Sequence, residues 1–233
     1  MNQTIPLLLV PGLASSARVY APIIPALWRL GTVMVANHIR DDSIEGIARR
    51  VLAEAPPRFA LAGHSMGGYI AFEIMRQAPE RVARLALINT QARADTPEAI
   101  ERRRGHIARA KRGELRALRD EMFPDLVHSS RRDDESLRKL MHVQDEDVGV
   151  ERYVAQQNAM IARVDSRPTM AGITCPTLVL SGDEDKLIPN WLSKEMADGI
   201  TGAKLVILDR CGHLPQPEQP EATIAALAEW LRS

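Results

Sequence analysis

A serine between two glycines is the first candidate for chemistry. Ser65 stands between Gly63 and Gly67 in the pattern G-x-S-x-G. The apolar run 59–62 precedes this pattern, and the helix-forming run 69–75 follows it. A strand, this pattern and then a helix form the context of a nucleophile elbow, whose sharp turn lifts the serine hydroxyl clear of the sheet. Glycines fit on either side because a Cβ would collide with the folded turn. We therefore predict that Ser65 is a nucleophile and not part of an ordinary glycine-rich turn.

A serine hydroxyl needs a base to take its proton, and the chain contains six histidines. His213 follows the strand-like run 204–208, at the edge where open α/β sheets build their sites. His64 adjoins the serine, but neighbouring side chains on a turn diverge. His38 follows another strand-like run and could reach the same edge. The other three lie in a charged helical region and are expected on solvated surface: His106, His128 and His142. His213 is therefore the predicted base.

An acid must hold the tautomer of this base and stabilise the imidazolium. The strand-like run 176–181 leads into a turn that contains Asp183, Glu184 and Asp185. Only one carboxylate needs to point at the histidine, so residue types alone leave all three open. The chain order is serine, acidic turn and then histidine, and each of the three follows a predicted strand.

These motifs resemble those of the α/β-hydrolase superfamily, in particular its lid-bearing esterases, C–C hydrolases and cofactor-free perhydrolases. The resemblance covers nearly the whole chain. Four segments carry it: the oxyanion loop at 10–13, the elbow at 62–68, the G-x-x-D-x-x-x-P turn at 182–189 and the G-H-x-x-x-x-E-x-P loop at 211–220. Matching the acid turn to the family pattern implies that Asp185 is the triad acid, with Asp183 as the alternative.

The resemblance implies a mechanism as well as a fold. Ser65 attacks an acyl carbonyl while His213 removes its proton and Asp185 holds the imidazole. The backbone N–H groups of Leu13 and Met66 form the oxyanion hole. Water then hydrolyses the acyl-enzyme. This chemistry requires no metal and no organic cofactor, and we expect neither.

The expected fold is α/β, with a mostly parallel α/β-hydrolase sheet of about six core strands and trimmed N-terminal strands. The strands are continuous apolar runs, as expected where helices cover both faces of a parallel sheet. They are predicted at 4–10, 32–37, 59–63, 84–89, 176–181 and 203–208. Helices are predicted at 17–30, 43–55, 66–78, 190–199 and 220–232, with Asp42 and Glu45, and Pro220, as starts.

Residues 91–170 interrupt this alternation, because they contain no strand pattern and many charged residues. Apolar residues recur there at helical spacing, so we predict a helical lid inserted after the fourth core strand, over the edge that carries the serine. The core domain then comprises 1–90 and 171–233. The charge runs 102–104 and 131–134 are interpreted as solvated helix faces.

Composition is that of an ordinary enzyme. The 233 residues contain 30 Lys and Arg against 30 Asp and Glu, so no net field favours nucleic acid or an anionic membrane. Residues 1–4 lack the basic region of a signal peptide. Two cysteines give no disulfide framework, which favours a reducing compartment and a cytoplasmic location. The oligomeric state stays open.

The substrate is less well defined. With three Phe, three Tyr and three Trp, and with Leu, Ile, Val and Met in the insertion, we expect an aliphatic pocket for small to medium carboxylic esters. C–C bond hydrolysis on the same triad is one alternative, although C–C hydrolases of the family usually have tryptophan after the base, where this chain has Leu214. Peracid formation on the same triad is a second alternative. A ligand-sensing protein of this fold is the alternative from another class, because fold and triad alone underdetermine function.

Overall fold

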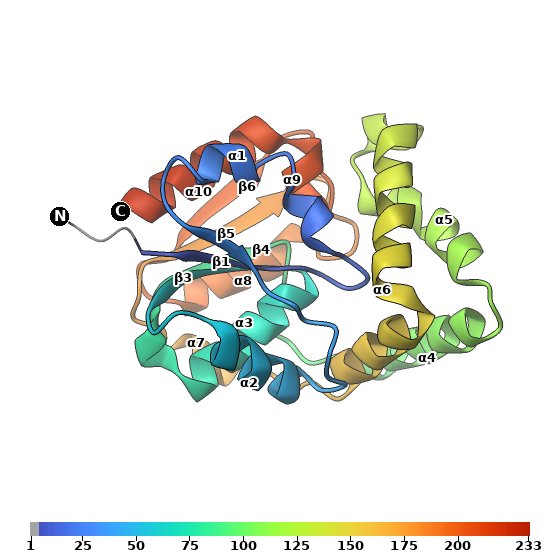
Figure 1. Ribbon diagram of the computed structural model, residues 1–233, viewed down its shortest axis with the longest axis horizontal. Helices are drawn as coiled ribbons and strands as arrows, with labels where there is room; N and C mark the ends of the chain where they lie inside the picture. The colour runs from blue at the N-terminus through green and yellow to red at the C-terminus, as the bar shows by residue number, and fades with distance from the viewer. Residues whose placement is uncertain (1–4) are drawn as a thin grey trace.

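A six-stranded, fully parallel sheet forms the centre of the computed structural model, which describes residues 5–233 (Figure 1). The strand order is β2-β1-β3-β4-β5-β6. The strands are β1 Leu7–Val10, β2 Val33–Val35, β3 Phe59–His64, β4 Val82–Ile88, β5 Thr177–Gly182 and β6 Lys204–Leu208. The predicted fold class is thereby confirmed. The predicted start of the first strand at residue 4 and the signal-peptide expectation for 1–4 lie outside the described residues.

Ten α-helices and three 3₁₀ helices are assigned within residues 5–233. The α-helices are α1 Ile24–Leu27, α2 Ile44–Glu54, α3 Met66–Gln77, α4 Pro97–Lys111, α5 Leu115–Leu126, α6 Glu135–Ile161, α7 Arg167–Met170, α8 Asn190–Gly199, α9 Pro215–Glu218 and α10 Pro220–Arg232. The 3₁₀ helices are η1 Ala17–Tyr20, η2 Pro79–Arg81 and η3 Ser129–Arg131.

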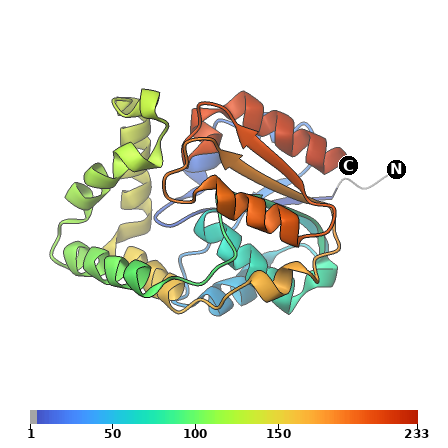
Figure 2. The same ribbon diagram turned by 180° about the vertical axis from the view of Figure 1, so that it is seen from behind.

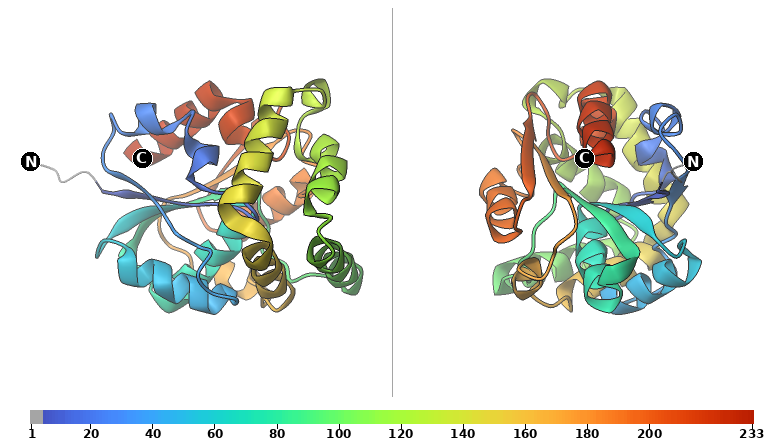
Figure 3. Two further views of the ribbon diagram at one scale, coloured as in Figure 1. Left: turned by 45° about the vertical axis from the view of Figure 1, so that its right-hand side comes forward. Right: turned by 90° about the vertical axis from the view of Figure 1, so that its left-hand side faces the viewer.

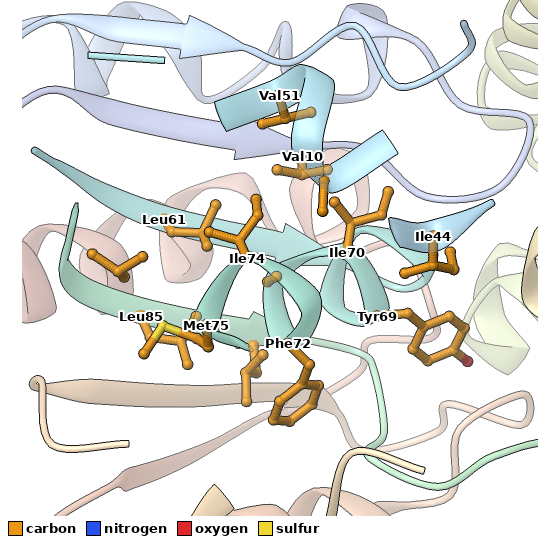
Figure 4. Close-up of a cluster of buried hydrophobic side chains, with 14 of the residues drawn as sticks. Val10, Ile44, Val51, Leu61, Tyr69, Ile70, Phe72, Ile74, Met75 and Leu85 are labelled. Atoms are coloured by element: carbon orange, nitrogen blue, oxygen red, sulfur yellow. The ribbon is translucent and has the colours of Figure 1, made fainter. Parts of the chain in front are cut away.

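Helices cover both faces of the sheet. On one face, α1 and α10 pack over the strands, and on the other lie α2, α3 and α8 (Figure 1). Figure 4 shows the second face, where Ile70 and Ile74 of α3 lie against Leu61 of β3. Fully burying one such aliphatic side chain stabilises the fold by roughly 1.5–3 kcal/mol. The sheet is thereby a rigid base for the loops at the carboxyl ends of its strands.

Some local predictions were wrong at element ends. The helix predicted at 17–30 is two short pieces, η1 and α1, because Pro22 and Pro25 remove backbone donors within it. Helix α2 is capped by Ser43, whose side chain accepts from the Gly46 N–H, and not by Asp42. Strand β6 is partly exposed because it lies at the sheet edge, so it is not the buried run that was expected.

Helices α4, α5 and α6 form a separate layer at the carboxyl ends of the strands (Figures 1 and 2). They lie in sequence between β4 and β5, which are neighbours in the sheet. Helix α6 bends at Gly149, whose φ of 76° is non-helical, and its two halves run in different directions (Figure 3). Glycine adopts this backbone conformation without a Cβ clash. Within residues 5–233 no helix is both long and apolar enough to cross a membrane.

Candidate active site

Ser65 occupies a strained turn between β3 and α3. Its φ of 54° and ψ of −118° lie outside the regions that L-residues favour. A Cβ added at Gly63 would overlap the carbonyl group of Gly67, and one added at Gly67 would overlap the carbonyl oxygen of Val10. The side chain of Thr90 donates to the Ser65 carbonyl oxygen at 2.8 Å. The elbow is therefore built by glycines that permit close backbone approach and by neighbours that hold the strained residue.

The structure brings the predicted serine, histidine and acid together in one hydrogen-bonded chain. His213 lies in the loop after β6, and its Nε2 is 2.9 Å from the Oγ of Ser65. Its Nδ1 is 2.8 Å from Oδ2 of Asp185, which lies in the turn after β5. His213 and Asp185 are 4% and 6% exposed, so the pair is shielded from water. With Nδ1 bonded to a carboxylate, the neutral imidazole presents an acceptor to the serine hydroxyl.

The two aspartates of the acid turn have different partners. Asp185 accepts the backbone N–H groups of Leu187 and Ile188 through Oδ1, both at 2.9 Å. Burial opposes ionisation of Asp185, but the attraction of His213 and these hydrogen bonds outweigh it and hold its pKa below the usual range. Asp183 instead accepts the N–H of Cys211 at 2.9 Å and shapes the turn. The geometry thus selects Asp185 as the partner of the histidine.

Two residues support the triad, and neither of them was assigned a role from the sequence. Asn89, directly after β4, donates its Nδ2–H to Oδ2 of Asp185 at 2.7 Å. Glu218 of α9 accepts the backbone N–H groups of Gly212 and Leu214, both at 3.1 Å, and so fixes the loop around the base. A polar residue directly after the apolar run of β4 was the signal for Asn89. Glu218 was visible as the glutamate of the histidine-loop motif.

The loop after β1 adjoins the nucleophile. A Cβ added at Gly12 would lie 3.1 Å from the Cβ of Ser65, so the backbone at Gly12 lies close to the serine. Leu13 lines the cavity above Ser65. Met66 is the first residue of α3, where backbone N–H groups have no intrahelical acceptor. Both predicted oxyanion donors therefore belong to segments that adjoin the serine.

Helix α6 holds this loop from above. Oε1 of Gln156 accepts the N–H of Ala14 at 2.9 Å, and Oε1 of Gln144 accepts the N–H of Ser16 at 3.1 Å. Both glutamines are buried, and Ala14 has a positive φ of 52°. Sequence reasoning missed them, because a glutamine on a charged helix has no distinctive signal. The inserted helices thus contribute to the shape of the loop.

Two further histidines are buried beside the site. His38 donates its Nε2–H to the Gly12 carbonyl oxygen at 2.9 Å, and burial lowers its pKa to about 4. His64 donates its Nε2–H to the carbonyl oxygen of His213 at 2.8 Å. Burial, followed by the nearby His213, lowers the pKa of His64 to about 3. Both are neutral structural groups that position the loops around the serine.

A cavity of about 370 Å³ opens above Ser65 and His213. Its walls come from the sheet edge and from α4, α5, α6 and α8. Met122 and Met160 of the insertion line it, as expected of cleft-facing apolar residues. Leu118 and Leu140, two other apolar residues of the insertion, do not line it, and Leu118 belongs instead to a buried cluster that includes Ala14. The cavity has the size of a small-molecule site.

The interpretation of the two charge runs as solvated helix faces holds for Arg102, Arg104, Arg132 and Asp133, which are exposed, but not for Arg103, which is partly buried. Arg102 and Arg103 also line the cavity, together with His106. The lining is therefore mixed, and not the aliphatic one that was expected. His128 and His142 are 8% and 9% exposed, so they are buried and not solvated. Helix packing turned these residues inward, which residue type alone could not indicate.

A family model described as "Alpha/beta hydrolase family" matches residues 6–226. A relative from Azorhizobium caulinodans with the provisional name carbamate hydrolase RutD is 30% identical, covering 89% of this chain and 84% of its own. A pimeloyl-acyl-carrier-protein methyl ester esterase from Aromatoleum aromaticum is 25% identical, covering 91% of this chain and 90% of its own. Among solved structures, a thermophilic esterase from Thermogutta terrifontis is 30% identical, with a TM-score of 0.90, covering 99% of this chain and 90% of that one. These names are those of hydrolases. The chain therefore belongs to the alpha/beta hydrolase family.

Proposed function

We propose that this protein is a serine hydrolase that cleaves carboxylic esters through an acyl-enzyme. The observation that carries the proposal is the hydrogen-bonded chain from Ser65 to His213 to Asp185, at 2.9 and 2.8 Å, on the floor of a small-molecule cavity. A nucleophile, its base and the orienting acid within hydrogen-bond reach form the arrangement that activates a serine.

In the first step, the Oγ of Ser65 attacks the ester carbonyl carbon as Nε2 of His213 takes the hydroxyl proton. The carbonyl electron pair moves to oxygen, and the N–H groups of Leu13 and Met66 bind this oxyanion. One such donor is typically worth roughly 2.7–4 kcal/mol of transition-state stabilisation. Asp185 stabilises the imidazolium without taking its proton.

The tetrahedral intermediate then collapses. The bond to the alcohol oxygen breaks, and His213 gives its proton to the leaving alcohol. Water enters, His213 takes one of its protons, and the resulting hydroxide attacks the acyl-Ser65 carbonyl. The second intermediate releases the carboxylic acid and returns the proton from the imidazolium to Oγ of Ser65. Every proton transfer passes through one nitrogen, which the two neighbours of the imidazole hold in place.

We propose that residues 91–170 act as a lid over this cavity, with 1–90 and 171–233 as the core domain. Met122 and Met160 line the cavity from above, while Ser65 and His213 lie below. Closure by the helices excludes water and selects the acyl group. The two glutamines of α6 that hold the loop after β1 connect the lid to the oxyanion donors.

The test is hydrolysis of p-nitrophenyl esters of graded acyl length by the wild type and by Ser65→Ala. We expect turnover by the wild type and a loss of roughly 10⁶-fold in kcat for the variant, as when a triad nucleophile is removed. Ser193→Ala is the matched control, since Ser193 is buried in α8 and does not line the cavity. A serine-directed phosphonate should label Ser65 alone. Ligand binding by the wild type without turnover or labelling would instead support the ligand-sensing alternative.

A further inference from the structure

Arginines gather in the upper wall of the cavity. Four of them line it, from the segment after β4 and from α4 and α5, and Asp95 is the single carboxylate among the lining residues identified in the described chain: Arg93, Arg102, Arg103 and Arg119. The chain as a whole has no net charge. The concentration of guanidinium groups in one cavity is therefore a local feature, and the proposed ester chemistry does not require it.

The single negative charge of Asp95 does not balance the positive charges of the arginines around it. Its carboxylate is paired with Arg103 at 2.6 Å and with Arg163 at 2.8 Å. The side chains of Asp95 and Arg163 are 3% and 4% exposed, and that of Arg103 is 17% exposed. Two guanidinium groups thus share one carboxylate in a poorly hydrated place. Among residues 5–233, Arg103 and Arg163 form no other ion pair, so the cluster carries a net positive charge that a bound anion would offset.

Arg103 is held in position with donors to spare. Its Nε–H donates to Asp95, and one Nη donates to Oε1 of Gln157 at 3.0 Å. A longer contact of 3.5 Å joins its other Nη to Asp95. A guanidinium group has five N–H donors, so two remain. Gln157 is buried and itself donates to the hydroxyl of Tyr153, which fixes the amide. The arginine is therefore preorganised to offer two donors to a ligand.

Arg102 adds a second positive charge at this end of the cavity. It is exposed, and no ion pair to it is found among residues 5–233. His106, one turn further along α4, lines the same wall. Burial lowers the pKa of His106, and the positive charges of Arg102 and Arg103 lower it further. Part of the lowering of the pKa of His106 therefore comes from positive charge at this wall of the cavity.

The other two lining arginines have carboxylate partners outside the cavity. Arg119 pairs with Asp145 at 3.0 Å, and both side chains are buried. Arg93 pairs with Glu195 and lies over the ring of Trp191. Within the described part of the chain, the four lining arginines and Arg163 together have three carboxylate ion-pair partners, which are Asp95, Asp145 and Glu195.

We propose that this wall is a carboxylate subsite, and that the substrate is an ester that also carries a carboxylate group. The inference rests on the proposed ester hydrolysis at Ser65 and names its substrate class. The free carboxylate binds Arg103 and Arg102, while the ester carbonyl lies between Ser65 and the oxyanion donors. A planar carboxylate matches the fork of a guanidinium group that has two donors left. Half-esters of short dicarboxylic acids have this form.

The test compares monomethyl glutarate with its monoamide, in which an uncharged carboxamide replaces the carboxylate. A hydrogen bond to a charged group is typically worth enough to favour the half-ester by roughly 10- to 100-fold in kcat/KM. Arg103→Gln should remove most of this preference through KM, with little change for the monoamide. Arg102→Gln should lower the preference in the same direction, and its exposed, unpaired position makes it a variant that folds. Arg104→Gln is the matched control, because Arg104 is on the same helix and does not line the cavity.

Binding to the inactive Ser65→Ala protein separates this inference from the proposed function. Calorimetry should detect monomethyl glutarate but not its monoamide, and Arg103→Gln added to that protein should abolish the binding. Esters hydrolysed without preference for the carboxylate, and unaffected by Arg103→Gln, would overturn the subsite alone. Binding of the half-ester without hydrolysis by the wild type would overturn the proposed function and leave the subsite standing. Tighter binding of inorganic phosphate than of the half-ester would overturn the choice of carboxylate.

Discussion

Lowering the pH from 7 to 5 should destabilise the fold through His38. This imidazole is 2% exposed, and burial lowers its pKa to about 4 in the folded chain, against an ordinary value of about 6.5. Between these two values the unfolded chain binds the proton and the folded chain does not. Stability from this group is therefore present above pH 6.5 and declines as the pH falls toward 4.

The magnitude follows from the two pKa values. At pH 5 the unfolded imidazole is almost fully protonated, while the folded one is almost fully neutral. The free energy of unfolding should fall by about 2 kcal/mol between pH 7 and 5 because of His38. His64, with a pKa of about 3 in the fold, should contribute a similar loss of about 2 kcal/mol. Together these are a large fraction of the 5–15 kcal/mol typical of a folded domain.

Urea unfolding followed by circular dichroism at pH 7 and pH 5 measures this loss directly. His38→Gln removes the titrating group and keeps a side-chain donor near the Gly12 carbonyl oxygen. Its free energy of unfolding should fall by about 2 kcal/mol less than that of the wild type over the same pH interval. His64→Gln provides the parallel measurement for the second histidine. Equal losses in the wild type and in both variants would refute the reasoning, because neither imidazole would then titrate differently in the two states.

Further predictions concern the groups around the triad. Asp185→Asn should lower kcat by about 10⁴-fold, since only the carboxylate holds the tautomer of the base. Asp183→Asn should keep most of kcat and lose roughly 1–3 kcal/mol of stability, seen by urea unfolding; the reverse ranking in kcat would reassign the acid. Asn89→Ala, which removes the hydrogen bond to Asp185, should cost roughly 1.5–3 kcal/mol of stability and lower kcat. Gln156→Leu leaves the buried N–H of Ala14 without an acceptor and should lower kcat more than it raises KM; an unchanged kcat would contradict its proposed role in holding the loop after β1.

The sheet and the order of the site could be predicted because they depend on local patterns. Buried parallel strands are apolar throughout, so their runs stand out from the helices between them. Helices at 190–199 and 220–232 were predicted to the residue. Pro220 supplies the start signal of the second helix. The failure at 17–30 has a local cause too, since two prolines there outweigh the helical pattern.

The neighbours of the triad could not be predicted in the same way. Gln156 and Gln144 act only because the bent helix α6 passes over the loop after β1. His38 is structural because the end of β2 brings it to Gly12. Each depends on contacts between segments more than 20 residues apart, and nothing in the local sequence marks a buried amide or imidazole as a partner of a backbone group. Sequence patterns therefore locate the reacting groups better than the groups that hold them.

The arginine run at 102–104 shows how helix geometry can indicate a buried charge that residue type alone does not indicate. Successive residues of an α-helix are about 100° apart around its axis, so three in a row span about 200°. A helix that packs on one side cannot keep such a span wholly in water, and at least one of the three must turn toward its partner. In α4 that residue is Arg103, which reaches Gln157 of α6, while Arg104 stays exposed. A run of like charges on a packed helix therefore places one charge inside, and such a charge persists where a buried counterion or a ligand offsets it. Here Asp95 offsets part of this positive charge. We propose that the carboxylate of a substrate offsets the rest.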